Sequence, residues 1–173
     1  MALAILARIR PMIKGFSVLN QKKSVKIFPS LDLRMISFLD VSSRDEAIDS
    51  LIDLFDQAGK LSDRLQFREA IFHREQLVST GIGVSVAVPH AKLGGFSEFS
   101  IAIGIQKGKG IDWNALDLTP VRIIFMIGGP DDRQSEYLQI LSQLTAAIKN
   151  VELRKALLKA TSSEQVLDLF SQF

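Results

Sequence analysis

The chain has 173 residues, of which 47% are hydrophobic and 23% are charged, a composition typical of one folded domain and not of a disordered chain. It contains no cysteine, which excludes disulfides, thiol catalysis and cysteine-ligated metal and is typical of a reducing cytoplasm. No apolar run approaches the roughly 18 residues of a membrane span. We therefore expect a cytoplasmic protein with no stable membrane insertion.

The positive charge is concentrated at the N-terminus. Residues 1–30 carry six lysines or arginines and no acidic residue, whereas the remaining chain carries 15 basic and 19 acidic residues, a net charge of −4. The sequence pI of about 9.0 therefore describes a tail, and we expect no nucleic-acid partner. We predict a basic, loosely ordered extension over residues 1–26 and one domain over residues 27–173.

The first part of the domain is predicted to hold two helices. Residues 43–60 place apolar side chains at three- to four-residue spacing, as an amphipathic helix does. Ser43 and Glu46 form a capping box at its start, and Gly59 is a favourable residue for its end. A second helix is predicted over residues 62–78, opened by the serine at its first position.

The spacing then changes to that of strands. Three valines alternate with smaller residues over residues 84–88, which predicts a strand. Pro89 has no amide hydrogen for a ladder, so we expect the strand to end there. Residues 99–106 predict another strand. The apolar run 121–127 predicts a buried strand, and the Gly-Gly-Pro that follows is expected to break it.

Three helices are predicted after the last strand. The first is a long amphipathic helix over residues 132–150. Its apolar face carries Tyr137, Leu141, Leu144 and Ile148, with Leu138 beside them. Two shorter helices cover residues 151–160 and 162–173, and Ser162 with Gln165 forms a capping box for the second. Because helices surround the strands in an irregular order, we predict an α/β (α+β) fold with a mixed sheet flanked by helices on both sides.

His90 is the main candidate for chemistry. The chain has only two histidines, and this one follows a proline at the end of the alternating run. An imidazole with one nitrogen held by a hydrogen bond keeps the other free as a nucleophile. A strand end provides a rigid and accessible support. The alternative is an ordinary surface or core histidine.

The loop before this strand is a candidate anion site. Thr80, Gly81 and Gly83 allow close backbone approach, and successive amides form anion-binding nests. The loop matches neither a Walker motif nor a dinucleotide fingerprint, and a plain helix-to-strand connection is the alternative. Arg74, near the end of the second helix, has a planar guanidinium suited to phosphate.

Other polar groups are weaker candidates. His73 and Glu75 are read as a polar helix end in preference to a metal or acid–base pair, because no other ligands cluster with them. We therefore predict no metal site. The acidic residues in "GIDWNALD" are read as turn and surface groups. A hydrolase using Ser85 and His90 is disfavoured, because their odd separation puts the side chains on opposite faces of a strand.

Three stretches together resemble a known family. "IFHREQLVSTGIGVSVAVPHAKLGG", "IDWNALDLTPVRIIFMIGGPDD" and the C-terminal helices are similar to the enzyme IIA domains of the phosphotransferase system, fructose–mannitol type. The resemblance covers residues 27–173 and implies the mannitol-type IIA fold.

The resemblance also implies a function that needs no cofactor. His90 would receive a phosphoryl group from the histidine carrier protein HPr or a paralogue, Arg74 would steady its charge, and backbone amides of the small residues before the strand would approach its oxygens. The sequence departs from the family pattern at three places. Ser85 and Ala91 stand where glycines are usual, and Tyr137 stands where a second active-site histidine is usual.

The biological role implied by the resemblance has three versions. The main one is a stand-alone, nitrogen-type IIA protein, whose phosphorylation state controls binding to a regulated target. The second is a free-standing fructose- or mannitol-type IIA component that passes phosphate to a IIB partner. The third, motivated by Ser85 and Tyr137, is a binding module that no longer takes part in phosphotransfer.

Overall fold

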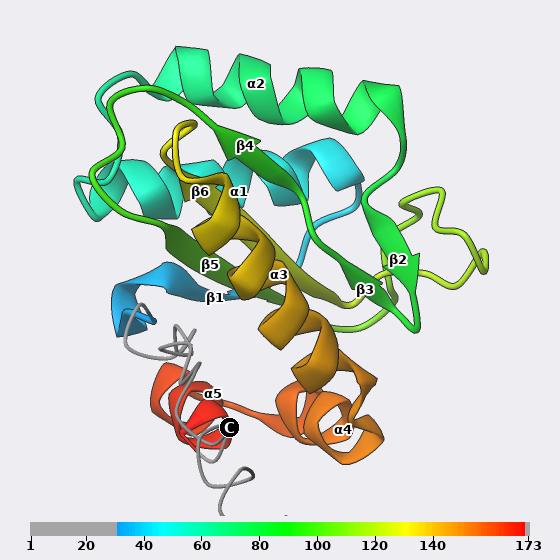
Figure 1. Ribbon diagram of the computed structural model, residues 1–173. Helices are drawn as coiled ribbons and strands as arrows, with labels where there is room; N and C mark the ends of the chain where they lie inside the picture. Colours follow the sequence, from blue (N-terminus) through cyan, green and yellow to red (C-terminus); the bar gives the residue numbers. More distant parts are fainter. Residues whose placement is uncertain (1–30, 172–173) are drawn as a thin grey trace, which may run out of the picture.

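The computed structural model describes residues 31–171, so the extension predicted at residues 1–26 and the domain boundary at residue 27 lie outside the described part. Five helices and six strands follow a short 3-10 turn at Leu33–Met35 (Figure 1). The helices are α1 (Arg44–Gln57), α2 (Arg64–Leu77), α3 (Gln134–Lys149), α4 (Val151–Lys159) and α5 (Ser163–Phe170). The strands are β1 (Ile36–Leu39), β2 (Gly81–Gly83), β3 (Val86–Ala87), β4 (His90–Lys92), β5 (Ser100–Gln106) and β6 (Ile123–Gly129).

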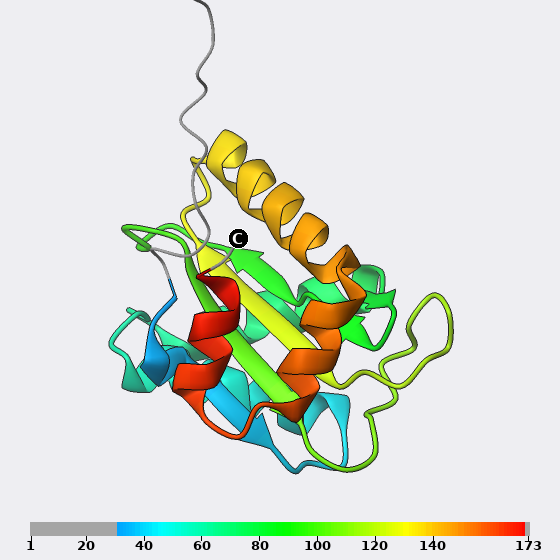
Figure 2. The ribbon, with the colours of Figure 1, turned by 90° about the horizontal axis from the view of Figure 1, so that it is seen from below.

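The strands form one mixed sheet, as predicted. Its order is β1-β5-β6-β3-β2, with β4 also paired to β6. The central pair, β5 and β6, is antiparallel, while β1 on one side and β3 and β4 on the other run parallel to their neighbours. Helices α1 and α2 cover one face of the sheet and α3, α4 and α5 cover the other (Figures 1 and 2). Each face has its own apolar core.

The predicted helix caps are confirmed for α1 and α5, and that for α2 is shifted by one residue. The hydroxyl oxygens of Ser43 and Ser162 accept hydrogen bonds from the third amides of their helices. Helix α2 is capped by Asp63, whose carboxylate accepts from the Gln66 amide, and not by Ser62. A carboxylate is also favoured at a helix N-terminus by the helix dipole.

The strand predicted over residues 84–88 is wrong in its first half. Val84 and Ser85 have positive φ angles of 50° and 64° and make the turn of a hairpin between β2 and β3. Their amides donate to the side chains of Asp117 and Thr119, at 2.8 Å and 3.2 Å. Such contacts from distant residues outweigh the alternating pattern, because a backbone in the left-handed region otherwise favours glycine.

Pro89 interrupts the sheet without ending it. Val86 pairs with Ile123, and His90 pairs with Ile127 in the same register, so β3 and β4 follow one another along the same side of β6. The proline lacks an amide, but its carbonyl accepts from the Ile127 amide at 3.0 Å. The strand therefore ends before this proline, as expected, and a new strand paired to β6 begins directly after it at His90.

Two further expectations are corrected near the start of α3. The Gly-Gly-Pro expected to break the last strand ends it only at the proline: both glycines belong to β6, and large aromatic side chains pack directly over them. Leu138, expected beside the apolar face of α3, is 54% exposed, whereas Tyr137 and Leu144 are buried. Neither result follows from the local spacing.

Candidate functional site

His90 opens β4, which lies alongside α2 in Figure 1. Side chains alternate along a strand. Ala91 is buried in the core beneath α1 and α2, while His90 and Lys92 are half-buried on the opposite face. The imidazole is therefore fixed by a rigid backbone and still reaches the surface.

The hydrogen bonds of the imidazole define its reactive nitrogen. Nδ1 lies 2.9 Å from the carbonyl oxygen of Val88. A carbonyl only accepts, so Nδ1 carries the hydrogen of the neutral ring. Nε2 then has a free lone pair and accepts from Nε of Arg74 at 3.1 Å. The site thus presents one nucleophilic nitrogen beside a guanidinium.

The surroundings keep this ring neutral. Burial lowers the pKa of His90 below its usual value of 6.5. The positive charges of Arg74 and Lys92 also lower this pKa, against the opposing effects of the Val88 carbonyl and the Glu75 carboxylate. A neutral imidazole is the nucleophilic form.

The lowered pKa of His90 predicts a pH dependence of stability. The unfolded chain binds a proton at about pH 6.5, whereas the folded ring binds it only at lower pH. Between these values the unfolded state holds more protons at this ring, so the contribution of His90 to the free energy of unfolding falls as the pH decreases through this window and is constant above it. Urea unfolding of the wild type and of His90→Gln on both sides of pH 6.5 measures this. We expect the wild type to lose more stability on acidification than the variant; equal losses would contradict the prediction.

Arg74 is held by the end of its own helix. Besides the bond from Nε to His90, Nη1 of Arg74 donates a hydrogen bond to the carbonyl oxygen of Val78 at 2.8 Å. Arg74, Thr80 and His90 line one cleft of about 260 Å³ together with Ile82 and Leu141. The structure therefore brings together three of the residues predicted to form an anion site.

Thr80 is more deeply engaged than the sequence indicated. Its amide donates to Oε1 of Glu75 at 2.9 Å, and its hydroxyl donates to Oε2 at 2.5 Å. The indole of Trp113 in turn donates to the Thr80 hydroxyl at 3.2 Å. All three residues are buried. Since both donors of Thr80 already have partners, this network fixes the loop between α2 and β2, and a direct contact of Thr80 with a phosphoryl group stays a prediction.

Sequence reasoning missed the role of Glu75. It was grouped with His73 as a polar helix end, but His73 is exposed and Glu75 is 4% exposed. A buried carboxylate needs hydrogen-bond donors. A signal was present in the sequence, because Thr80 follows Glu75 by only five residues across the end of the helix.

The two glycines of the loop serve close packing. A Cβ atom on Gly81 would lie 2.9 Å from Ala115, and one on Gly83 would lie 2.9 Å from the Asp117 carboxylate. Gly83 also has a φ angle of +87°. These contacts seat β2 against the loop over residues 112–119. Approach of the glycine amides to a phosphoryl group stays a prediction.

Tyr137 lies against the imidazole, where the family resemblance implied a second site residue. Its ring centroid is 5.6 Å from that of His90 and 6.0 Å from that of Phe99. Burial raises the pKa of Tyr137 to about 12, so the phenol stays protonated and uncharged at neutral pH. Tyr137 therefore cannot supply the positive charge of a protonated histidine.

The departures at the two usual glycine positions have different consequences. Ser85 sits in the hairpin turn with a φ angle of 64°, a conformation that favours glycine. Its turn position offers no support for a hydrolase pairing with His90. Ala91 is buried on the sheet face away from the imidazole ring.

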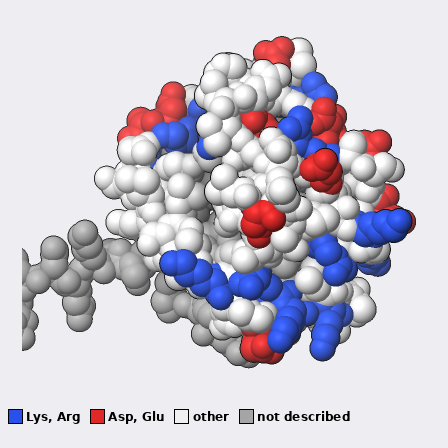
Figure 3. Space-filling view, turned by 90° about the vertical axis from the view of Figure 1, so that its right-hand side faces the viewer, with Lys and Arg blue, Asp and Glu red and all other residues white. Residues whose placement is uncertain are grey.

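An exposed apolar surface adjoins the cleft at Ile82. The large apolar side chains exposed there are Leu77, Val78, Ile82, Val84, Leu116 and Leu118. They come from the end of α2, from the β2–β3 hairpin and from the loop over residues 112–119. Figure 3 shows this side of the molecule, where uncharged atoms cover much of the face and lysine and arginine gather along its lower edge. Exposed apolar patches rimmed by charge are typical of protein–protein contact sites.

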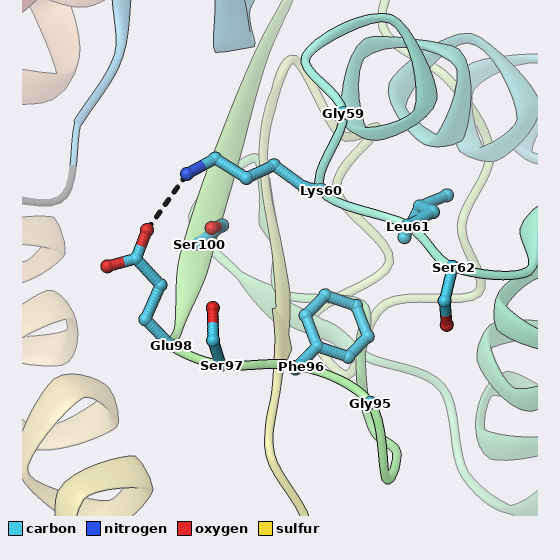
Figure 4. Close-up of a pocket in the computed structure, with 9 residues that line it drawn as sticks. All are labelled: Gly59, Lys60, Leu61, Ser62, Gly95, Phe96, Ser97, Glu98 and Ser100. Atoms are coloured by element: carbon cyan, nitrogen blue, oxygen red, sulfur yellow. Dashed lines mark hydrogen bonds and ion pairs between the residues drawn. The ribbon is translucent and has the colours of Figure 1, made fainter.

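A second cavity lies away from His90. It has a volume of about 310 Å³ and is formed by the α1–α2 connection and the segment before β5 (Figure 4). Lys60 and Glu98 form an ion pair of 2.9 Å at this cavity. Among residues 31–171, no three metal-ligating side chains cluster, and no helix is long and apolar enough to cross a membrane.

The fold is a mixed sheet between two layers of helices, and its site is the half-buried imidazole of His90 paired with Arg74. The family model described as phosphoenolpyruvate-dependent sugar phosphotransferase system, EIIA 2, matches residues 30–173, and the chain belongs to this family.

Relatives in this family come from different systems. The fructose-specific EIIABC component of Bacillus subtilis is 37% identical over 134 residues, which are 78% of this chain but only 21% of that protein. The fructose-specific EIIA component of Haloferax volcanii is 34% identical over 131 residues, 76% of this chain and 84% of that protein. The nitrogen regulatory protein of Klebsiella oxytoca is 28% identical over 130 residues, 75% of this chain and 80% of that protein.

Solved structures share the fold. Nitrogen regulatory protein IIA-Ntr from Neisseria meningitidis has a TM-score of 0.77 and 28% identity, covering 83% of this chain and 98% of that one. IIA mannitol from Escherichia coli has a TM-score of 0.69 and 22% identity, covering 81% and 98%. The predicted mannitol-type IIA fold is confirmed.

Proposed function

We propose that this protein is a phosphocarrier that accepts a phosphoryl group on Nε2 of His90 from an HPr-like phosphohistidine protein. The observation that carries the proposal is the pair of hydrogen bonds on the imidazole. Nδ1 of His90 donates its hydrogen to the Val88 carbonyl oxygen, with 2.9 Å between the two atoms. Nε2 carries no hydrogen and accepts from Nε of Arg74 at 3.1 Å. Membership of the EIIA 2 family supports the same chemistry.

The reaction exchanges one P–N bond for another. The lone pair of His90 Nε2 forms a bond to phosphorus, the P–N bond to the donor histidine breaks, and its electron pair returns to the donor nitrogen. The Nδ1 hydrogen stays on His90, where the Val88 carbonyl stabilises the positive ring. The guanidinium of Arg74 then donates to the phosphoryl oxygens in place of Nε2, because its planar fork matches them. Such transfer depends on positioning and charge stabilisation more than on further covalent steps.

The apolar surface beside the cleft supports delivery by a protein. Leu116 and Leu118 are 84% and 82% exposed, and a small-molecule donor would gain little from them. A protein donor that covers these side chains also excludes water from the phosphoryl group, which strengthens its contact with Arg74.

For the biological role, we propose a nitrogen-type regulatory IIA protein, whose phosphorylation changes its binding to a regulated target. The likeness to IIA-Ntr, which covers 98% of that chain, supports this version. The higher identity to the fructose-specific components, 37% and 34%, favours the second version, transfer to a IIB partner. Addition of phosphorylated protein to a fructose-type IIB domain separates them, because only the second version predicts rapid loss of label to that domain.

The test of phosphoryl acceptance is an intact-mass measurement. The purified chain is mixed with phosphoenolpyruvate, enzyme I and HPr, and we expect the mass to rise by one acid-labile phosphoryl group. His90→Ala should show no gain, while His73→Ala, which removes the other histidine of the chain, should behave as the wild type. A wild-type chain that gains no mass beside an active donor would overturn the proposal.

A further inference from the structure

Lys92 shares the face of β4 that carries His90. The two residues are separated by the buried Ala91, so their side chains emerge on the same side of the strand. The ammonium of Lys92 lies 5.1 Å from the centroid of the Tyr137 ring. It also donates a hydrogen bond to the side-chain oxygen of Gln134 in the first turn of α3. Two contacts from α3 therefore fix the position of this lysine.

Tyr137 contacts both His90 and Lys92. The centroid of its ring lies 5.6 Å from the centroid of the His90 ring. The same ring is a cation–π partner of Lys92, whose ammonium nitrogen lies 5.1 Å from the centroid. Tyr137 is 6% exposed and stacks on Phe99 at 6.0 Å. Because this ring is itself held firmly, its cation–π contact keeps the Lys92 ammonium near the imidazole. Little side-chain entropy is then lost when a phosphoryl group arrives.

The charge of the product calls for more than one cation. A phosphoryl group on His90 carries a charge of about −2 when fully ionised. Arg74 supplies one positive charge beside Nε2, and the phenol of Tyr137 supplies none. Lys92 is the next cation whose charge acts on the ring. Its ammonium is a compact point charge with three donors, which suits contact with phosphoryl oxygens.

We infer that Lys92 provides the second positive charge for the phosphoryl group on His90, and that Tyr137 acts as the platform that positions Lys92. The inference rests on the proposed phosphocarrier function. In this inference the aromatic ring of Tyr137 is the functional group at this position, and its hydroxyl is not. A tyrosine and a lysine together then replace the charged histidine that the family resemblance implied.

Four variants separate these roles. Lys92→Met removes the charge and keeps the length of the side chain, and Lys92→Arg keeps the charge. Tyr137→Phe keeps the ring and removes the hydroxyl, whereas Tyr137→Leu removes the ring. Lys155→Met is the matched control, because Lys155 is an exposed lysine paired with Glu152 on α4.

The first readout is the rate of phosphoryl acceptance from phosphorylated HPr. We expect Lys92→Met and Tyr137→Leu to be slower by about tenfold, the effect of one partly screened charge. Lys92→Arg, Tyr137→Phe and Lys155→Met should stay within about threefold of the wild type. A wild-type rate for Lys92→Met would overturn the inference, and a Tyr137→Phe rate as low as that of Tyr137→Leu would assign the effect to the hydroxyl instead.

The second readout needs no donor protein. NMR titration of the His90 ring reports its pKa, which is set by burial and by the charges of Arg74, Glu75 and Lys92. Lys92→Met should raise this pKa, Lys92→Arg should leave it unchanged, and a merely structural role of the lysine would not distinguish the two. An unchanged pKa in Lys92→Met would overturn the inference even if the wild type accepts phosphate, whereas a raised pKa with no acceptance would sink the proposed function alone.

Discussion

Replacing Arg74 by alanine is expected to lower the rate of phosphoryl acceptance by about a hundredfold, the usual loss for one donor aimed at developing charge. Arg74 is the nearest cation to the nucleophile, with Nε 3.1 Å from His90 Nε2. Its bond to the Val78 carbonyl at 2.8 Å holds the guanidinium in place before the phosphoryl group arrives. Ordering of this side chain during transfer therefore costs little free energy.

Rapid-quench transfer from phosphorylated HPr measures the effect. Arg74→Lys should recover part of the lost rate, about tenfold, because a lysine restores the charge but not the planar fork. Arg68→Ala is the matched control on the same helix, since Arg68 pairs with Asp49 and lies over Phe72. An Arg74→Ala rate within about threefold of the wild type would remove Arg74 from the transfer step.

Replacing Gly129 by alanine is expected to destabilise the fold by about 3 kcal/mol, at the upper end of the effects of overpacking. A Cβ atom there would lie 2.0 Å from Cδ1 of Phe99, well inside van der Waals contact. Phe99 is buried and stacks on Tyr137, so the ring can make room for the methyl group only by disturbing its packed neighbours. Gly129 also pairs with Lys92 in the sheet, so the same substitution should disturb the positioning of that lysine.

Urea unfolding of Gly129→Ala measures this loss, with Gly94→Ala as the control. A Cβ atom on Gly94 would meet no atom within 4 Å, and its stability should stay within about 0.5 kcal/mol of the wild type. Equal stability of the two variants would show that the Phe99 ring moves aside, and would contradict the tight packing described above.

The sequence by itself determined the helices and their main caps, and it singled out His90 as the candidate for chemistry. Amphipathic spacing and the caps at Ser43 and Ser162 are local, because a helix satisfies its hydrogen bonds within a few residues. The buried strands β5 and β6 were also predicted within two residues at their ends. The string around His90, together with Arg74, was specific enough to indicate the family that the comparisons confirmed.

The tertiary structure decided whatever depends on contacts between distant parts of the chain. The turn at Val84 and Ser85 exists because Asp117 and Thr119, more than 30 residues away, accept their amides. Gly129 is a strand residue because it pairs with Lys92 of β4, and Phe99 packs over it. The ammonium of Lys92 lies near the site because it packs over the ring of Tyr137, a residue of α3. Local periodicity carries no information about such pairings, since they form only when the sheet and its two helical layers come together.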